Sequence, residues 1–460
     1  MLPAGAKDRF EDVTGPLGCL DSPEELELYG YDGGADRHPP ELVLLPRSVE
    51  EVSAIARVAH ELKIPLVGRG ASTGLSGGSV PCRGGVVVAF ARMNRILEID
   101  LENERAIVEP GVVNQDITEA VEGQGYCFAP DPSSRRACTI GGNVAENAGG
   151  AHSPAYGVTA SHVLGMEFVL PGGAIVQTGG KQCDLPGYDL TGLLTGSEGT
   201  LALVTKVIVR LTRKPEAAKT ALAIFGSIEA AVSAISKISA KAIAPAALEL
   251  LDGPMLRIVE EAAHAGFPVD AAAVLLMGLE GMRERVDEQM KRLREYCVQC
   301  GAREFRVART PEDRDLLWKG RHDAFGAVGR VSPAYLVADG VAPRTEIGAL
   351  LSVIAEVRAR YSLTIGTVVH AAEGHLLPVI LFDPRRADEA ERARAAAGEI
   401  LEAAIRAGGS ITGELGVGMD KLGLMGRLFN AESLAMMRAL KRQFDPHGIL
   451  NPGKALPAGD

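Results

Sequence analysis

The sequence predicts an α+β protein built from two domains. Its 460 residues exceed the length that one hydrophobic core usually organises. Helical and strand-like apolar periodicities both occur, and several strand segments are joined by tight turns, which indicates antiparallel sheets with helices packed against them. The composition, with 46% hydrophobic and 23% charged residues, is typical of a globular protein.

The first half of the chain mixes helices and strands and forms an expected first domain, residues 1–214. Residues Ser48-Val-Glu-Glu51 form a Ser-x-x-Glu signal that is typical of a helix N-terminus, and Pro65 ends the helical pattern that follows. The expected elements are a helix over 48–62, strands at 85–90, a hairpin over 98–110 and a helix from Asn114.

After Lys214-Pro215 the character changes, and alanine-rich helical segments introduce a second expected domain, residues 215–429. The expected elements there are strands at 273–281, 334–341, 365–370 and 377–382, and helices at 282–297, 311–325, 344–361 and 388–407. Residues 430–460 read as a helix followed by Asn-Pro-Gly, and we expect this segment to pack back on the first domain.

The net charge of the chain limits the expected partners, and its lack of long apolar segments limits the expected location. There are 59 acidic and 48 basic residues, so the formal charge of −11 would repel polyanions, and nucleic acid is not expected as a ligand. No run of 18 apolar residues is present, the first residues are charged, and the seven cysteines are odd in number and scattered. We therefore expect a cytoplasmic protein without a transmembrane segment.

Residues 68–78, Gly-Arg-Gly-Ala-Ser-Thr-Gly-Leu-Ser-Gly-Gly, follow an expected strand, where a dinucleotide fingerprint would lie. The spacing does not fit G-x-G-x-x-G, and a helix cannot start directly after it. Such a loop can instead point several backbone N–H groups inward as an anion-binding nest, or it can be a loose surface loop. The residues proposed to hold a pyrophosphate are Arg69, Gly70, Ala71, Ser72, Thr73, Gly74 and Ser76.

A second glycine-rich region makes the loose-loop alternative less attractive. Residues 129–134 contain two prolines and are stiff, whereas 140–150 carry almost no bulky side chains. One segment can therefore position another whose backbone lies against a flat ring. The two regions together favour a nucleotide with a large planar head.

Five segments resemble the FAD-binding subunit of bacterial glycolate oxidase over almost the whole chain. They are GRGASTGLSGGSVP, APDPSSRRACTIGGNVAENAGGAHSPAYGVT, TGSEGTLALVT, WKGRHDAFGAVGR and FDPHGILNPGK. That subunit belongs to a flavoprotein group that includes D-lactate and D-2-hydroxyglutarate dehydrogenases. The resemblance implies the two-domain vanillyl-alcohol-oxidase fold of PCMH type, with residues 215–429 as the substrate, or cap, domain.

The resemblance also implies FAD contacts at matching positions. Beyond the 68–78 loop, these positions are Pro130, Asp131, Ser134, Gly141, Gly142, Asn143 and Gly149 for the isoalloxazine and ribityl region, Glu198, Gly199 and Val204 for the adenine side, and Asn451 from the C-terminal segment. The first loop contains no histidine that could form a covalent link to the flavin. Non-covalent FAD is therefore expected.

The implied reaction passes the Cα hydride of a small 2-hydroxy acid, such as glycolate or D-lactate, to flavin N5. One group must then remove the hydroxyl proton and another must hold the carboxylate. Arg321 matches the family position for the carboxylate clamp, a role that suits the two parallel donors of a guanidinium. A structural ion pair is the alternative role for this arginine.

The metal motif of the family is altered in this chain. The family pattern H-A-G-D-G-N-x-H-P corresponds to residues 370–378, and G-G-S-I-S-G-E-H-G-I-G to 408–418. Leu377 therefore replaces a ligand histidine and Leu415 replaces the histidine expected as base. Leucine neither coordinates a metal nor accepts a proton, so both departures affect the reaction itself.

Two versions of the catalytic site remain open at the level of sequence. In one, His375 joins His370 and Glu414 in a rebuilt three-ligand site for Zn or Mn. In the other, which we favour, the site is metal-free and either histidine acts as base.

Two functions follow from these versions. The first is an FAD-dependent dehydrogenase that passes electrons to an iron–sulfur subunit, an electron-transfer flavoprotein or a quinone. The second is a non-catalytic FAD-binding subunit of a glycolate-oxidase-like complex.

Overall fold

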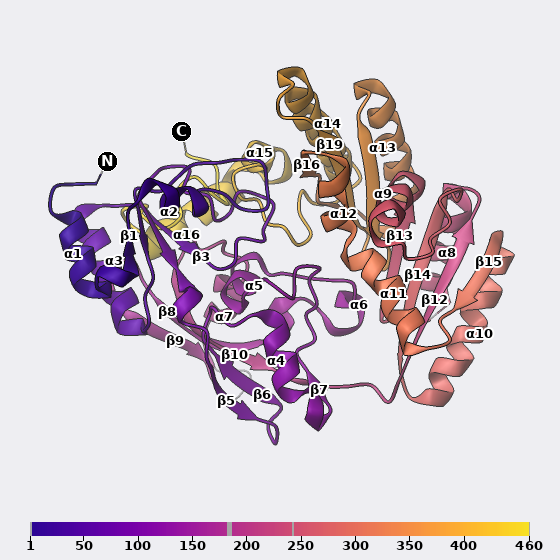
Figure 1. Cartoon of the computed structure of the whole chain (residues 1–460), viewed down its shortest axis with the longest axis horizontal. Helices are drawn as coiled ribbons and strands as arrows, with labels where there is room; N and C mark the ends of the chain where they lie inside the picture. Colours follow the sequence, from indigo (N-terminus) through magenta and orange to yellow (C-terminus); the bar gives the residue numbers. More distant parts are fainter. Residues whose placement is uncertain (1, 182–185, 242, 460) are drawn as a thin grey trace. The chain divides into compact units, whose positions relative to one another are not determined.

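The computed structural model describes residues 2–181, 186–241 and 243–459, which form two compact units (Figure 1). The first unit consists of the chain up to Gly149, Gly157–Lys214 and the chain from Glu414 onward. The second consists of Gly150–Tyr156 and Pro215–Gly413. These units and the expected domains both divide the chain after Lys214, but the first unit also contains residues 414–429.

The first unit contains a small sheet whose strands lie in the order β1, β2, β4 and β3, with the three last strands parallel. Their bounds are Cys19–Leu20, Leu42–Leu44, Val86–Ala89 and Leu66–Arg69. Short Val- and Leu-rich strands of this kind are typical of parallel sheets covered on both faces. A bridge between Leu66 and Leu450 adds the C-terminal segment beside β3.

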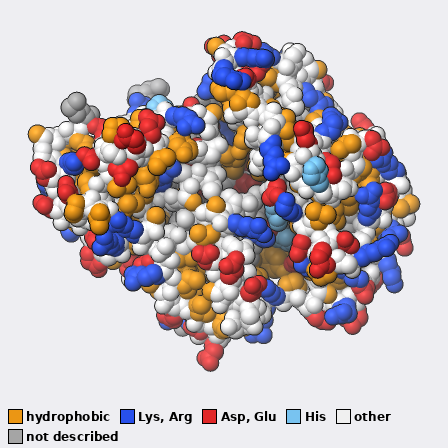
Figure 2. Space-filling view, viewed as in Figure 1, with side chains coloured by type: hydrophobic (Ala, Val, Ile, Leu, Met, Phe, Trp, Pro, Cys, Tyr) orange, Lys and Arg blue, Asp and Glu red, His pale blue; other side chains and the backbone are white. Residues whose placement is uncertain are grey.

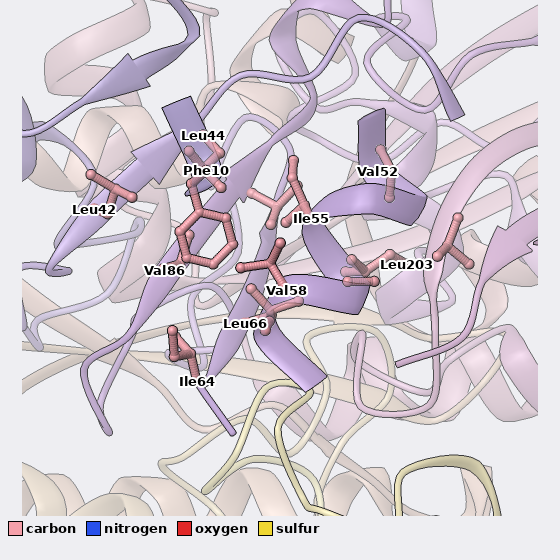
Figure 3. Close-up of a cluster of buried hydrophobic side chains, with 14 of the residues drawn as sticks. Phe10, Leu42, Leu44, Val52, Ile55, Val58, Ile64, Leu66, Val86 and Leu203 are labelled. Atoms are coloured by element: carbon pink, nitrogen blue, oxygen red, sulfur yellow. The ribbon is translucent and has the colours of Figure 1, made fainter. Parts of the chain in front are cut away.

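A hydrophobic cluster joins this sheet to the helices α1 (Ala6–Thr14) and α3 (Val49–Leu62), as Figure 3 shows. Phe10 from α1 and Ile55 from α3 are completely buried there. Ser48 caps α3 by accepting a hydrogen bond from the N–H of Glu51 at 3.3 Å, which confirms the predicted helix start. The core thus fixes the end of β3, from which the first glycine loop departs.

The second sheet of the first unit is antiparallel, with the order β5, β6, β10, β8 and β9. Its strands are Ile96–Asp100, Arg105–Val108, Leu203–Arg210, Val163–Val169 and Ile175–Gly179. The predicted hairpin is confirmed by β5 and β6, and the predicted helix from Asn114 by α4 (Asn114–Val121). A short pair, β7 (Tyr126–Cys127) and β11 (Thr212–Arg213), lies nearby in the same unit.

The remaining helices of this unit are short except for the last. They are α2 (Pro23–Leu28), α5 (Ile140–Glu146), α7 (Leu190–Leu194), α15 (Met425–Leu428) and α16 (Ala431–Phe444).

The second unit is built on an eight-stranded antiparallel sheet with the order β15, β12, β14, β13, β18, β19 and β16, while β17 pairs with β19. The strands are Ala302–Val307, Ala217–Phe225, Ala273–Gly281, Ala247–Asp252, Thr364–His370, His375–Phe382, Ala334–Val337 and, for β17, Gly340–Val341. The predicted antiparallel sheet is confirmed. Every residue of β13 and β19 is buried, so these central strands are covered on both faces.

The helices of the second unit are α6 (Ser153–Tyr156), α8 (Ile228–Ala240), α9 (Gly253–Ala263), α10 (Arg283–Gln299), α11 (Pro311–His322), α12 (Ala324–Val331), α13 (Ile347–Tyr361) and α14 (Ala387–Arg406). Two expected elements are each divided. The helix predicted over 311–325 is interrupted at Asp323, and the strand predicted over 334–341 is interrupted at Ala338-Asp339. The second interruption places the buried Asp339 beside His375.

Acidic and basic side chains are interspersed on the face of the molecule shown in Figure 2. No helix in the described part of the chain combines the length and apolar character needed to cross a membrane.

Candidate active site and flavin-binding loops

The first glycine loop runs from Gly70 to Ser79 between β3 and β4, without a helix. Ser72 adopts a left-handed conformation with φ 54°, and its Oγ lies 2.8 Å from Ser79 Oγ. Within the described chain, the backbone N–H groups of residues 71–76 donate to no protein acceptor. A row of donors of this kind fits the phosphates of a dinucleotide.

Arg69 has a different environment from the one expected for a phosphate ligand. Its guanidinium is largely buried and donates to the backbone oxygens of Leu28 at 3.2 Å and Tyr31 at 2.8 Å. Burial lowers the pKa of this guanidinium, and the nearby Asp32 opposes that effect. Arg69 therefore fastens the segment after α2 to the start of the loop.

The second glycine-rich region forms the helix α5, which the sequence did not predict. Thr139 Oγ1 caps it by accepting from the N–H of Gly142 at 3.4 Å. The two regions touch, because a Cβ atom at Gly70 would lie 2.2 Å from Thr139 Oγ1. Glycine at position 70 is thus required for the loop to approach the helix.

A buried amide network shapes the segment before α5. Asn114 Nδ2 donates to the backbone oxygen of Pro130 at 3.1 Å and to Asn143 Oδ1 at 3.0 Å. Asp131 is also buried, and Ser134 is half-buried in the turn that follows. Two of the expected flavin positions, Pro130 and Asn143, are therefore held in one network.

The other expected FAD positions lie at separate points of the first unit. Gly149, the last residue of the first stretch of chain in this unit, is buried, and Val204 is half-buried in β10. Gly199 has φ 65°, and Asn451 has φ 41° and is buried. The side chain of Asn451 donates to the backbone oxygens of Gly78 and Glu198 at 2.8 and 2.7 Å, so it connects the first loop to the Glu198 turn.

Glu198 anchors the chain that follows the metal motif. Its carboxylate accepts from the N–H of Val417 at 2.8 Å and of Gly418 at 2.7 Å. Burial raises the pKa of the Glu198 carboxyl, and these two hydrogen bonds oppose the rise. The same segment is fastened to the first loop where Ser76 Oγ donates to the backbone oxygen of Leu415 at 2.7 Å.

Glu146, at the end of α5, carries a buried carboxyl oxygen, Oε2, without a hydrogen-bond partner among the described residues. A Cβ atom at Gly78 would lie 2.7 Å from its other oxygen, so the carboxyl lies directly against the first loop. Burial, reinforced by Glu198, raises the pKa of Glu146 well above its usual value. The orphaned amides of 71–76 call for acceptors, which the phosphates of FAD offer, and the orphaned oxygen of Glu146 calls for a donor, which the hydroxyl groups of FAD offer.

In the second unit, three side chains stand in a row across three neighbouring strands. Glu249 on β13 pairs in register with His370 on β18, which pairs with His375 on β19. Directly opposed residues of antiparallel strands point to the same face. The two imidazole rings consequently lie with their centroids 5.1 Å apart.

Glu249 holds both His370 and Arg321. Its Oε1 lies 2.7 Å from His370 Nδ1, and its Oε2 accepts from Arg321 Nε at 2.6 Å. All three residues are almost completely buried. Burial alone would raise the pKa of the Glu249 carboxyl, but the charges of His370 and Arg321 outweigh it and lower that pKa to about 2.

Arg321 comes from α11 and is the largest fully buried side chain of the molecule's described part. Its Nη2 lies 3.4 Å from His370 Nε2, and its Nη1 has no hydrogen-bond partner among the described residues. A buried guanidinium nitrogen without an acceptor is costly unless a ligand supplies one. Arg321 thus forms a buried ion pair, which was its alternative role, and Nη1 remains as a free donor for the expected substrate carboxylate.

His375 is held by a second buried acid, Asp339, which lies at the interruption between β16 and β17. His375 Nε2 and Asp339 Oδ1 form a hydrogen bond. Asp339 also accepts from the hydroxyl of Thr412 at 2.5 Å and from the N–H of Gly413 at 3.0 Å. Each histidine of the pair is therefore oriented by its own carboxylate.

Glu414 follows Gly413 by one peptide bond. His370, His375 and Glu414 each offer a ligand atom, and these atoms lie within 4.8 Å of one another. Leu377 is completely buried on the same strand as His375, two residues further along, and so faces the same side of the sheet. The histidine at 375 thus stands one step along β19 from the family position at 377.

Sequence reasoning missed Glu249 and Asp339, although both left a signal. Each is an isolated acid inside a strand-like apolar run, Ala-Leu-Glu-Leu-Leu and Leu-Val-Ala-Asp-Gly-Val. A charged residue in such a run is rarely buried unless it is paired. Glu146 was missed because it lies in a glycine-rich segment that gives no apolar pattern.

The fold and these sites define a flavin-dependent oxidoreductase with an antiparallel second unit. Residues 40–179 match the FAD binding domain family, and residues 214–455 match the C-terminal domain of FAD linked oxidases. The chain belongs to this family of FAD-linked oxidases.

Individual relatives agree with this assignment. The chain is 44% identical to "Glycolate oxidase subunit GlcD" of Escherichia coli (strain K12), over 97% of this chain and 90% of that protein. It is 32% identical to "Probable D-lactate dehydrogenase, mitochondrial" of Danio rerio, over 97% and 90% of the two chains. The crystal structure of p-cresol methylhydroxylase with substrate bound matches with a TM-score of 0.82 at 19% identity, over 99% of this chain and 97% of that one, which confirms the fold.

Proposed function

We propose that this protein is an FAD-dependent dehydrogenase that oxidises a small 2-hydroxy acid of the glycolate or D-lactate type. The names of its relatives support this substrate class. The observation that carries the proposal is the buried Glu249–Arg321–His370 cluster, which presents a free guanidinium nitrogen beside a histidine nitrogen.

The chain's own residues would divide the work as follows. Arg321 Nη1 donates to the substrate carboxylate and orients the molecule. Glu249 keeps the Nδ1–H of His370 occupied, so that Nε2 carries the lone pair that accepts the hydroxyl proton. Bound FAD supplies the hydride acceptor. A buried base held in one tautomer is typically worth about 10²–10⁴ in rate.

A metal-dependent version of the same function is favoured by one specific observation, the grouping of His370, His375 and Glu414. In each of the two histidines, one ring nitrogen is hydrogen-bonded to a carboxylate. Such a carboxylate commonly orients histidines that bind a metal. A divalent metal such as Zn²⁺ or Mn²⁺ would acidify the substrate hydroxyl and replace the base that Leu415 cannot provide.

We also propose that the protein acts as one subunit of a larger enzyme, as the printed names of its bacterial relatives suggest. An iron–sulfur subunit or an electron-transfer flavoprotein would then accept the electrons. Cytoplasmic location remains part of this proposal.

Anaerobic reduction of the purified flavoprotein tests the function. We expect glycolate or one enantiomer of lactate to bleach the absorbance of oxidised flavin, and the Arg321→Lys variant to bleach at least 100-fold more slowly, since lysine lacks the planar fork. Arg314→Lys, on the exposed side of α11, is the matched control and should behave as the parent protein. If no 2-hydroxy acid reduces the flavin, the chain is the non-catalytic subunit instead.

Metal analysis separates the two versions of the mechanism. The metal-free version predicts activity that survives EDTA treatment and less than about 0.1 equivalent of zinc or manganese. Near one equivalent of metal, removed together with activity and lost in His375→Ala, would establish the other version.

A further inference from the structure

The second unit contains a cavity of about 480 Å³ that the proposed reaction does not use. It lies where α9 begins and α13 packs, and its lining includes Asp252, Arg257, Leu351, Ile354, Arg358 and Leu363. No residue of the Glu249–Arg321–His370 cluster lines it. Its volume falls in the range of about 300–1,000 Å³ that is usual for small-molecule sites.

Asp252 provides one polar end of this cavity. Its side chain is 6% exposed, and its Oδ1 accepts from the N–H groups of Met255 and Thr367, both at 2.9 Å. No residue of the described chain donates a hydrogen bond to Oδ2. Burial raises the pKa of this carboxyl to about 6, and its hydrogen bonds and the charge of Arg358 oppose the rise. Such a group calls for a cationic donor.

Two arginines provide the opposite charge. Arg257 lies exposed on α9 and Arg358 half-buried on α13. Neither forms an ion pair with an acid of the described chain, and the one hydrogen bond of Arg358, from Nη1 to the backbone oxygen of Ile365, is long at 3.5 Å. The charge of Arg358 lowers the pKa of Asp252, but no acid lies within ion-pair distance of either guanidinium in the described chain. Both groups are therefore suited to bind a carboxylate.

An apolar wall completes the lining. Leu351, Ile354 and Leu363 are 6, 2 and 7% exposed, and all three line the cavity. An aliphatic side chain of a ligand would bury its surface there at about 25 cal/mol per Å².

We propose that this cavity binds a free α-amino acid with an aliphatic side chain. Its ammonium group would donate to Asp252, its carboxylate would accept from Arg257 and Arg358, and its side chain would pack on Leu351, Ile354 and Leu363. This binding site does not depend on the oxidation of 2-hydroxy acids by the same protein.

Calorimetric titration of the FAD-loaded protein with L-leucine tests the proposal. We expect saturable binding with one site per chain. Two comparators each lack one charged group of leucine: 4-methylpentanoate lacks the ammonium and 3-methylbutylamine lacks the carboxylate. Each should bind at least 10-fold more weakly than leucine. Equal binding of either comparator, or no saturable heat with leucine, would overturn the proposal.

A third compound, 2-hydroxy-4-methylpentanoate, distinguishes an amino-acid site from a second site for hydroxy acids. It replaces the ammonium by a hydroxyl, and we expect it to bind at least 10-fold more weakly in protein whose flavin has been reduced beforehand. Binding as tight as that of leucine would refute the amino-acid assignment.

Variants locate the site. Arg358→Met keeps the aliphatic stem but removes the charge, and Asp252→Asn keeps the cap of α9, so each should lower leucine affinity at least 10-fold. Arg360→Met lies on the same helix outside the cavity and should leave it unchanged. Should Asp252→Asn not fold, Arg257→Gln at an exposed position replaces it. Flavin content should be the same in all variants, and unchanged leucine affinity in Arg358→Met would contradict the assignment.

Discussion

Glu249 is the residue on which the catalytic cluster depends, because one carboxylate holds both a cation and an imidazole. Its pKa of about 2 shows that the ion pairs outweigh the cost of burial. Removing one member of a buried ion pair leaves the other charge without a partner. The loss of stability is far larger than the loss from breaking an exposed ion pair.

We expect Glu249→Gln to lower the free energy of unfolding by about 3 to 5 kcal/mol. The flavin reduction rate should also fall, since His370 loses the acceptor that fixes its tautomer. Urea denaturation and anaerobic stopped-flow measure the two effects. Glu304→Gln, which breaks an exposed pair with Arg306, is the control and should cost less than 1 kcal/mol, which is about the value of a surface pair. Equal losses in both variants would refute the central place of Glu249.

The pKa of Asp252 is shifted in the opposite direction from that of Glu249, so Asp252 affects the pH dependence of stability in the opposite way. The pKa of its carboxyl is raised to about 6 in the folded protein, above the ordinary 3.8, so the folded state takes up the proton first as pH falls. Stability should therefore rise as pH falls from 7 to 4.5, by about 2 kcal/mol relative to Asp252→Asn, whose amide does not titrate. Urea unfolding of both proteins at pH 7 and pH 4.5 measures this, and a difference independent of pH would contradict it.

At the scale of single residues, functional residues could be predicted from the sequence where they belong to a motif of known chemistry. Arg321, His370, His375 and Glu414 were predicted from their motifs, and the structure places the rings of the two histidines side by side and tilted, with centroids 5.1 Å apart. Hairpin parity could not be deduced from sequence, because the turn at 371–374 had to be known before His375 could be assigned to a face. The partners Glu249 and Asp339 are more than thirty residues away from their histidines, and no local pattern connects them.

Among the elements, the segment after Gly413 is held by hydrogen bonds from side chains of distant loops. Ser76 and Glu198 bind the backbone of residues 415–418, and Lys421 Nζ donates to the oxygen of Gly416 at 2.9 Å. The conformation of this segment, which carries Leu415, is thus set by the first glycine loop and the Glu198 turn of its own unit.

Glu198→Ala should release this segment. The amide protons of Val417 and Gly418 lose their acceptors, so we expect their hydrogen exchange to accelerate at least 10-fold, in line with the roughly 1–3 kcal/mol cost of an unsatisfied buried donor. Exchange measured by mass spectrometry checks this. Glu122→Ala, which breaks an exposed pair with Lys214, should leave exchange in 415–418 unchanged. Unaltered exchange in Glu198→Ala would show that other contacts hold the segment.

Elements with a strong hydrophobic periodicity were predicted well from the sequence, as α3 and the hairpin of β5 and β6 show. The helix α5 was not, since its glycines have low helix propensity and its stability comes from the Thr139 cap and the Asn114 network. Tertiary contacts of this type are invisible to a local pattern. The same reason explains why one expected strand is divided at Asp339.

For the whole molecule, the chain divides into two compact units, and the expected FAD positions all belong to the first. A ligand that binds one folded unit stabilises that unit by mass action, by about 2.7 kcal/mol at a concentration of 100 Kd.

We therefore expect calorimetry of the FAD-free protein to show two thermal transitions, of which FAD addition raises one. AMP at the same concentration is the control and should raise it less. A single transition, or an equal rise of both, would show that the units do not unfold separately.

The pairing of Leu66 with Leu450, and the reach of Asn451 to Gly78, have a consequence for biosynthesis. More than 380 residues separate Leu66 from Leu450, so the ribosome must synthesise Leu450 before β3 gains this neighbour. We therefore expect nascent chains that stop short of Leu450 to retain little of the yellow chromophore.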